Sequence, residues 1–228
     1  MPVKPIPSEL NEHTAKLIVG FIAISLAIVE YFLTDGKLHS VSESYVLGDW
    51  PRNVFVGSLA AIGAFMLSYN GKQPHQIFQM AMSKVAALAA FGIALFPCLC
   101  ERDPSGLAFP YLHGALTGLL FIILVLFCYF FYQRAWEKYL DARTLGKSGL
   151  PPKIRAGIYA LCGGLIAISI LSIAINQFTG KVISEKYPIF TFIFEYIGLV
   201  SFGIAWLTAG GYVLPGRTIS MLKKHEII

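Results

Sequence analysis

Five polar side chains interrupt stretches of sequence that are otherwise apolar. They are Glu30, Arg52, Asn53, His113 and Glu195. A charged group at the centre of a bilayer costs about 2.5–3.5 kcal/mol on insertion scales, so each such residue needs a partner or a function. A carboxyl, a guanidinium and an imidazole group that converge could hold an anionic headgroup or a small acid and exchange a proton with it. These five residues are therefore the candidate ligand-binding residues of the chain.

Glu195 is the most informative of the five. It lies in the apolar run Ile189-Phe-Thr-Phe-Ile-Phe-Glu195-Tyr-Ile-Gly-Leu-Val, which holds no other charge. Glu195 is therefore either protonated or paired with a group from another span. Arg52 and His113 are the partners whose predicted depth fits. Two interpretations stay open: an ion pair that locks two spans together, or a ligand or proton site open to the outer side.

The other candidates also have plainer interpretations. Glu30 lies one turn from the end of its span and could reach water along its own side chain. Arg52 follows Trp50 and Pro51 and could be an interfacial anchor. His113 could hydrogen-bond a neighbouring carbonyl group and do nothing more. Beside them, we expect the polar residues of the first outer loop to be solvated: Ser42, Glu43, Ser44 and Asp49.

The four cysteines match no metal or disulfide framework. Cys98 and Cys100 together with His113 fall short of a Cys/His zinc signature, and a bridge between Cys98 and Cys100 would close a small, strained ring. Cys128 and Cys162 lie in the opposite half of the predicted bundle. We interpret all four as packing residues and predict no metal and no cofactor. The motifs HExxH and GxSxG and the P-loop, which mark soluble enzymes, are absent from the sequence.

The composition explains why these polar residues stand out. Of 228 residues, 56% are apolar and 14% are charged, whereas about 25% are charged in an average soluble domain. The mean hydropathy is +0.64. Six apolar stretches are nearly long enough to cross about 30 Å of hydrocarbon: residues 16–33, 53–69, 83–98, 110–132, 155–175 and 188–208. The sequence therefore predicts an all-α fold, a single six-helix transmembrane domain over residues 1–228.

Lysine and arginine are distributed unequally between the two sides of this bundle. With a cytoplasmic N-terminus, thirteen of the eighteen fall on the cytoplasmic side, as the positive-inside rule requires. We therefore predict that both termini are cytoplasmic and that all five candidate residues lie in the outer half. Residues 133–153 supply the largest share of the positive charge and are expected on the membrane surface. Small residues around Gly57 and Gly164 predict close helix contacts.

Topology also accounts for the net charge of +5. Basic residues interleaved with aromatic rings, as in a protein that binds single-stranded nucleic acid, do not occur. We therefore expect membrane lipids and a small-molecule or lipid-like ligand as partners, and no nucleic acid.

Three segments resemble parts of a group of uncharacterised bacterial six-helix inner-membrane proteins: Arg52-Asn-Val-Phe-Val-Gly-Ser-Leu59 with Ile62-Gly63, Ala90 to Pro97, and Phe194-Glu195 with Ser201-Phe-Gly-Ile-Ala-Trp206. In that group the residue after the arginine is often aspartate, and Asn53 in its place argues against an acid role there. The resemblance implies a bacterial inner (plasma) membrane protein and brings no activity with it. A more distant similarity is to the seven-helix superfamily that includes alkaline ceramidases, but the His-xxx-His pattern expected for their zinc is missing.

These observations favour a protein that binds or transports a small or lipid-like ligand in an outward-facing polar pocket. Two alternatives stay open. One is an intramembrane lipid-modifying hydrolase with His113 or Glu195 as the general base. The other is a structural subunit of a larger membrane complex.

Overall fold

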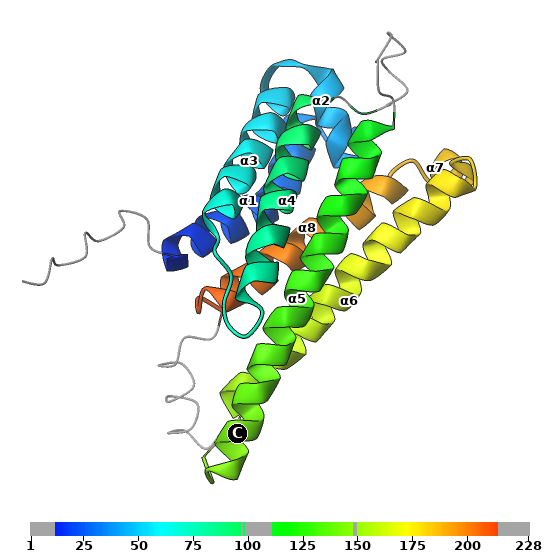
Figure 1. The fold of residues 1–228 in the computed structure, drawn as a ribbon. Coiled ribbons are helices and arrows are strands. Elements are labelled where there is room, and N and C mark those ends of the chain that lie inside the picture. Colours follow the sequence, from blue (N-terminus) through cyan, green and yellow to red (C-terminus); the bar gives the residue numbers. More distant parts are fainter. Residues whose placement is uncertain (1–11, 97, 99–110, 148–149, 214–228) are drawn as a thin grey trace, which may run out of the picture.

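The computed structural model describes residues 12–96, 98, 111–147 and 150–213 (Figure 1), and within these residues the fold is entirely helical, without a strand. The elements in chain order are α1 (Glu12–Leu33), the 3-10 helix η1 (Val41–Glu43), α2 (Ser44–Leu47), α3 (Asp49–Ser68), α4 (Gln76–Leu95), α5 (Leu112–Thr144), α6 (Leu150–Phe178), α7 (Val182–Lys186) and α8 (Phe190–Ala209).

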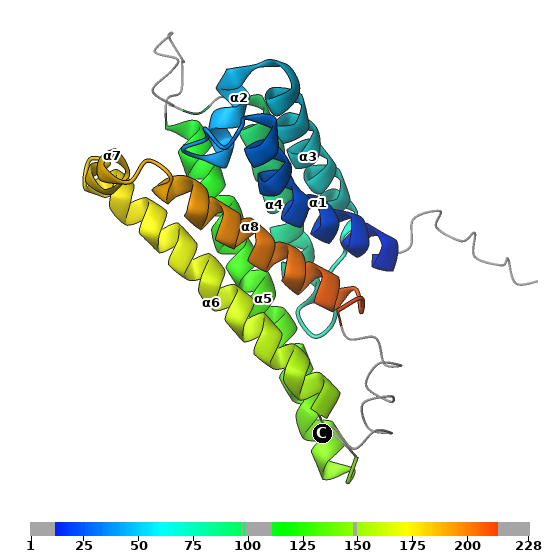
Figure 2. The ribbon, with the colours of Figure 1, turned by 180° about the vertical axis from the view of Figure 1, so that it is seen from behind.

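The six long helices within the described ranges, α1, α3, α4, α5, α6 and α8, alternate in direction and pack into one bundle. α1, α3 and α4 form one group, and α5 and α6 form a long hairpin beside it. α8 lies between α1 and α6 and contacts both of them, as the view from behind shows (Figure 2). Because the helices alternate in direction, three of these long helices begin at each end of the bundle. One end holds the beginnings of α1, α4 and α6, and the other holds the beginnings of α3, α5 and α8.

Among the described residues, five helices are long and apolar enough to cross a membrane: α1, α4, α5, α6 and α8. Large apolar side chains point outward from them, among them Phe21, Leu88 and Leu171 at 66%, 67% and 60% exposure. So much exposed apolar surface suits contact with lipid rather than with water. The chain is therefore a multi-pass integral membrane protein. α3 has the same length as α4 and α8 but begins with the polar residues Asp49, Arg52 and Asn53.

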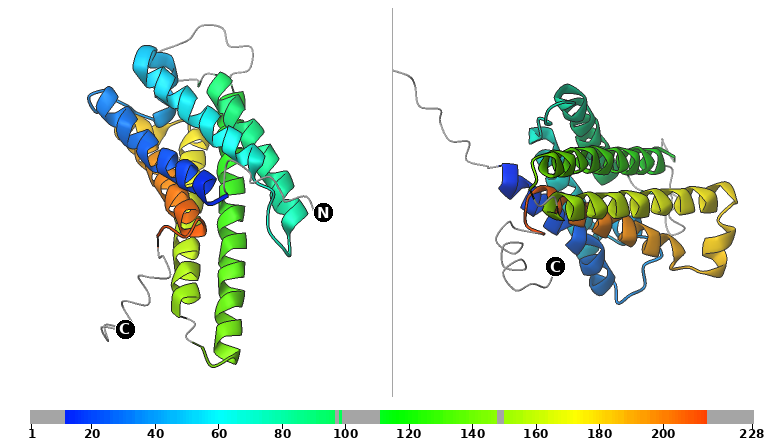
Figure 3. Two further views of the ribbon diagram at one scale, coloured as in Figure 1. Left: turned by 90° about the vertical axis from the view of Figure 1, so that its left-hand side faces the viewer. Right: turned by 90° about the horizontal axis from the view of Figure 1, so that it is seen from below.

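Most boundaries of the predicted spans lie close to the first or last residue of a long helix. One difference is α4, which begins at residue 76 rather than 83. Another is the segment 133–153, which does not lie as a loop on the membrane surface, because α5 and α6 continue through most of it. α5 has 33 residues, about 50 Å at 1.5 Å per residue, whereas the hydrocarbon is about 30 Å thick. The α5–α6 hairpin accordingly extends beyond the other helices (Figure 3).

Glycine lets α1 and α8 cross with their backbones in contact. A Cβ atom added at Gly203 of α8 would lie 2.5 Å from Ile24 Cγ1 and 2.7 Å from the carbonyl oxygen of Gly20. Real Cβ atoms do not approach other atoms so closely, and small residues are what allows such helix contacts in membranes. The predicted glycine contacts were wrong, since a Cβ atom at Gly57 or Gly164 would meet nothing within 4 Å.

Replacing Gly203 with alanine is therefore expected to destabilise the protein by about 1–3 kcal/mol, the usual effect of overpacking. The matched control is Gly164→Ala in α6. It should leave stability unchanged or raise it, because alanine is the better helix former by up to about 1 kcal/mol where space is free. Unfolding in a denaturing detergent, followed by circular dichroism, measures both changes. If Gly203→Ala and Gly164→Ala were equally stable, the close contact of α8 with α1 at Gly203 would be contradicted.

Candidate functional site

Glu195 binds the backbone of the connection between α1 and α3. It is 8% exposed. Its Oε2 atom accepts a hydrogen bond from the Val41 N–H group at 2.5 Å, and its Oε1 atom accepts one from the Ser42 hydroxyl group at 3.2 Å. The polar partner of Glu195 is therefore the segment 41–42, rather than a side chain of α3 or α5.

This connection is an ordered, buried element. Ser40 Oγ accepts a hydrogen bond from the Glu43 N–H group at 3.1 Å, and Glu43 Oε2 accepts one from the His39 N–H group at 2.8 Å. The two bonds cap η1 much as a capping box caps a helix. Ser42, Glu43 and Ser44 are all buried, so the expectation that they are solvated was wrong. The pair Ser40-x-x-Glu43 was the sequence signal of this cap.

Arg52 and Asn53 lie in the first turns of α3, and both are exposed. The Arg52 guanidinium group stacks over the Tyr45 ring at 4.5 Å from its centroid. In the part of the chain that the structure describes, no hydrogen bond, ion pair or ring contact joins any two of Arg52, His113 and Glu195. A ligand site built from these residues at the outer end stays a prediction.

His113 is buried at the first turn of α5. Its Nδ1 atom lies 2.7 Å from the carbonyl oxygen of Phe96, and its ring stacks on Phe55 of α3 with the centroids 6.4 Å apart. Its Nε2 atom is buried without a hydrogen-bond partner. The position of His113 thus matches the plainer interpretation, a histidine that links α5 to the end of α4.

Glu30 is fully buried near the end of α1. Its side chain does not reach the surface, so the expectation that it extends to water was wrong. Among the described residues, no group of three or more histidine, cysteine or acidic side chains could hold a metal ion.

The cysteines divide into two kinds. Cys128 and Cys162 are free and buried, as packing residues should be. Cys98 takes part in a disulfide bond, so the interpretation of Cys98 as a packing residue was wrong. Its Sγ atom lies 3.4 Å from the Ser42 carbonyl oxygen. Cys100 lies outside the described residues.

A cleft of about 420 Å³ opens at the opposite end of the bundle, where α1 and α6 begin and α8 ends. Cationic side chains from α1, the α3–α4 connection, α5 and α6 line it: Lys16, Lys72, Arg134, Lys138 and Arg155. The remaining lining residues are Phe131, Ala135, Pro151, Pro152, Tyr159, Thr208 and Ala209. None of the lining residues that the structure describes is acidic. The cleft, termed the basic cleft below, therefore attracts anions.

Aromatic side chains form the floor of the basic cleft. The Phe131 ring lies 5.5 Å from Trp206 and 5.4 Å from Tyr159, centroid to centroid. Lys16 is only 4% exposed, and its Nζ atom lies 5.6 Å from the centroid of the Tyr69 ring. Charges held over such an apolar, poorly hydrated base attract an anion more strongly than charges in water do.

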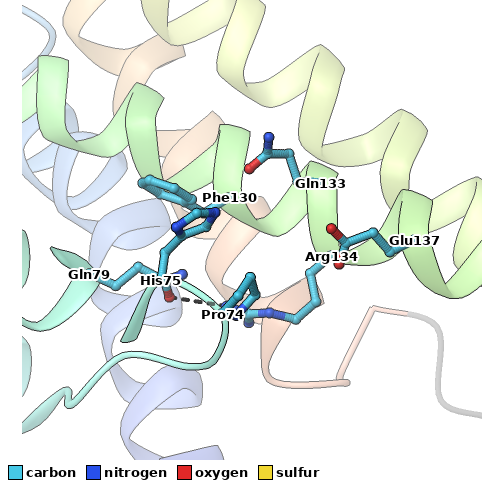
Figure 4. Close-up of a pocket in the computed structure, with 7 residues that line it drawn as sticks. All are labelled: Pro74, His75, Gln79, Phe130, Gln133, Arg134 and Glu137. Carbon is cyan, nitrogen blue, oxygen red and sulfur yellow. Dashed lines mark hydrogen bonds between the residues drawn. The ribbon is translucent and has the colours of Figure 1, made fainter. Parts of the chain in front are cut away.

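Gln79 of α4 orients one of the arginines. Its Oε1 atom accepts a hydrogen bond from Arg134 Nη2 at 3.0 Å (Figure 4). The same atom accepts bonds from the Tyr69 hydroxyl group at 3.2 Å and the Lys72 N–H group at 3.3 Å. Arg134 Nε is buried without an acceptor, while the residue itself lines the basic cleft. Gln79 itself is 1% exposed, and it therefore fixes Arg134 at the edge of the cleft.

Sequence reasoning counted these cations but missed that they converge. These cations were explained by the positive-inside rule. That rule counts lysine and arginine residues on each side of the membrane and does not predict which side chains lie close together. Two signals were present. Lys16 stands at the edge of an apolar span, and Gln79 is a polar residue within α4.

Comparison with protein-family models, with curated proteins and with solved structures finds no match to this chain. The function is therefore argued from the side chains alone, and the resemblance to the bacterial six-helix group stays a prediction.

Proposed function

We propose that this chain is a six-helix protein of the bacterial inner membrane, with both termini in the cytoplasm, that binds a phosphate-bearing anion in its basic cleft. The observation that carries the proposal is the convergence of five cationic side chains on one cleft: Lys16, Lys72, Arg134, Lys138 and Arg155.

The topology rests on the arrangement of the helices and on the charge distribution. α3 runs alongside α1 and α4, has 20 residues and supplies the sixth span. The basic cleft lies at the end of the bundle where α1 begins, and nine of the thirteen lysine and arginine residues that the structure describes belong to that side. The positive-inside rule therefore assigns this end to the cytoplasm.

A phosphate group fits the chemistry of the cleft better than a single carboxylate does. An arginine side chain presents a planar set of donors that matches two phosphate oxygens, and lysine side chains add further positive charge. Arg134 is already oriented for this by Gln79.

Two sources of phosphate share this chemistry, an anionic lipid headgroup and a soluble phosphomonoester. Basic pockets between transmembrane helices on the cytoplasmic side are typical binding sites for anionic headgroups. The apolar floor of Phe131 and Tyr159 would also accommodate the glycerol or acyl part of a lipid.

The experiment is a thermal-unfolding titration of the protein in phosphatidylcholine nanodiscs at constant ionic strength. The ligands are short-chain phosphatidic acid and glycerol 3-phosphate, with short-chain phosphatidylcholine as the control. A ligand at a hundred times its Kd should stabilise the protein by about 2.7 kcal/mol. Stabilisation by the lipid alone assigns a headgroup, and stabilisation by both ligands assigns a soluble phosphomonoester. If neither ligand stabilises more than phosphatidylcholine does, the proposal is wrong.

A further inference from the structure

Glu30 differs from the other acidic side chains that the structure describes at the outer end of the bundle. It is 0% exposed, and neither of its carboxyl oxygens has a hydrogen-bond partner. Ser44 of α2 is equally buried, and its hydroxyl group faces the Glu30 carboxyl group and can donate a hydrogen bond to it. Glu195 at the same end has donors on both of its oxygens. The two buried carboxyl groups thus differ, because Glu30 has the Ser44 hydroxyl group as its one facing donor among the described residues.

An ionised carboxylate in such surroundings needs donors or a counter-ion. The elements that cover or pack against this part of α1 are η1, α2, α3 and α8. Their titratable and charged groups at this end are Glu43, Tyr45, Asp49, Arg52, Glu195 and Tyr196. Arg52 is the cation among them, and it is exposed over Tyr45. Nothing in this set supplies a buried positive charge to Glu30.

The Ser44 hydroxyl group can donate to one oxygen of an ionised Glu30, which would leave the other oxygen and the negative charge buried without a partner. A proton on Glu30 removes that charge. The carboxylic acid has one O–H donor, and a serine hydroxyl oxygen can accept it. We propose that Glu30 and Ser44 form a proton-binding site beneath the outer surface, in which the Glu30 carboxyl group carries the proton and donates to Ser44 Oγ.

The segment 41–44 covers this site, and Glu195 holds the segment in place through Val41 and Ser42. When the segment lifts, water reaches Glu30, the O–H bond breaks, and the proton passes to water as the carboxylate forms. Closing returns the proton and excludes water again. Glu195 therefore acts as a positioning residue for the site, and Glu30 binds the proton.

Infrared spectroscopy of the protein in bilayers at neutral pH tests the site. A protonated carboxyl group has a C=O stretching band that is separate from the carboxylate bands. We expect this band in the wild type, its loss in Glu30→Gln and its retention in Glu185→Gln, which alters an exposed residue of α7. Ser44→Ala should shift the band to higher frequency, because the hydrogen bond is lost. If Glu30→Gln does not fold, the frequency shift of the band in Ser44→Ala still tests the site.

The exchange of the proton for deuterium tests the role of Glu195. Glu195→Gln should speed the isotope shift of the band at least about tenfold, because the hydrogen bonds that hold the segment 41–42 in the closed state are weakened. A spectrum unchanged by both Glu30→Gln and Ser44→Ala would overturn the proposal. So would a band that disappears when potassium is replaced by sodium, since Glu30 would then bind the metal ion.

Discussion

Replacing Arg134 with alanine is expected to weaken phosphate binding about 10- to 100-fold, the range for the loss of a charged hydrogen-bonding partner. Arg134→Lys should recover only part of the affinity, because an ammonium group lacks the planar set of donors. Gln79→Leu should lower the affinity as well, since it removes the acceptor that orients the guanidinium group. Ligand titration in nanodiscs measures all three changes.

Arg143 provides the matched control for Arg134. It lies in the last turn of α5, is exposed and does not line the basic cleft. Arg143→Ala removes the same charge from the same helix, so a general electrostatic effect would lower the affinity in both variants, and more strongly at low salt. Equal losses from Arg134→Ala and Arg143→Ala would show that the ligand does not bind in the cleft.

Replacing Glu195 with alanine is expected to lower the free energy of unfolding by about 2–4 kcal/mol, because a buried N–H group and a buried hydroxyl group lose their acceptor together. The segment 41–44 should become accessible first. A cysteine introduced at Ser42 would then react with a water-soluble maleimide much faster in the Glu195→Ala background than in the otherwise wild-type protein.

Glu185→Ala is the control for this second prediction. Glu185 belongs to α7 at the same end of the bundle, and its side chain is exposed. Its loss should change stability by less than about 0.5 kcal/mol. If Glu195→Ala were as stable as Glu185→Ala, the hydrogen bonds to Val41 and Ser42 would contribute nothing to the fold.

Hydropathy alone predicted where the long helices run, because the chain must match the apolar thickness of a bilayer. It could not predict where α5 ends and α6 begins. Beyond Tyr132 the sequence Gln-Arg-Ala-Trp-Glu-Lys-Tyr-Leu is no longer apolar, yet most of these residues are good helix formers. The helix therefore continues after the hydrophobic signal has stopped.

The candidate site was harder to predict for a different reason. The sequence analysis paired Glu195 with other side chains, whereas its partners include a backbone N–H group, which every residue except proline carries. The basic cleft combines residues from five separate segments: α1, the α3–α4 connection, α5, α6 and α8. Counting charges by side could not reveal that these side chains share one cavity, since this depends on how the α5–α6 hairpin packs beside α1 and α8.

A density map of the protein in nanodiscs that contain short-chain phosphatidic acid tests the central claim most directly. The account predicts density for a phosphate group in contact with the Arg134 guanidinium group, between α1, α5 and α6. Density at the outer end, among Arg52, His113 and Glu195, with the basic cleft empty, would contradict it and would restore the outer pocket as the ligand site.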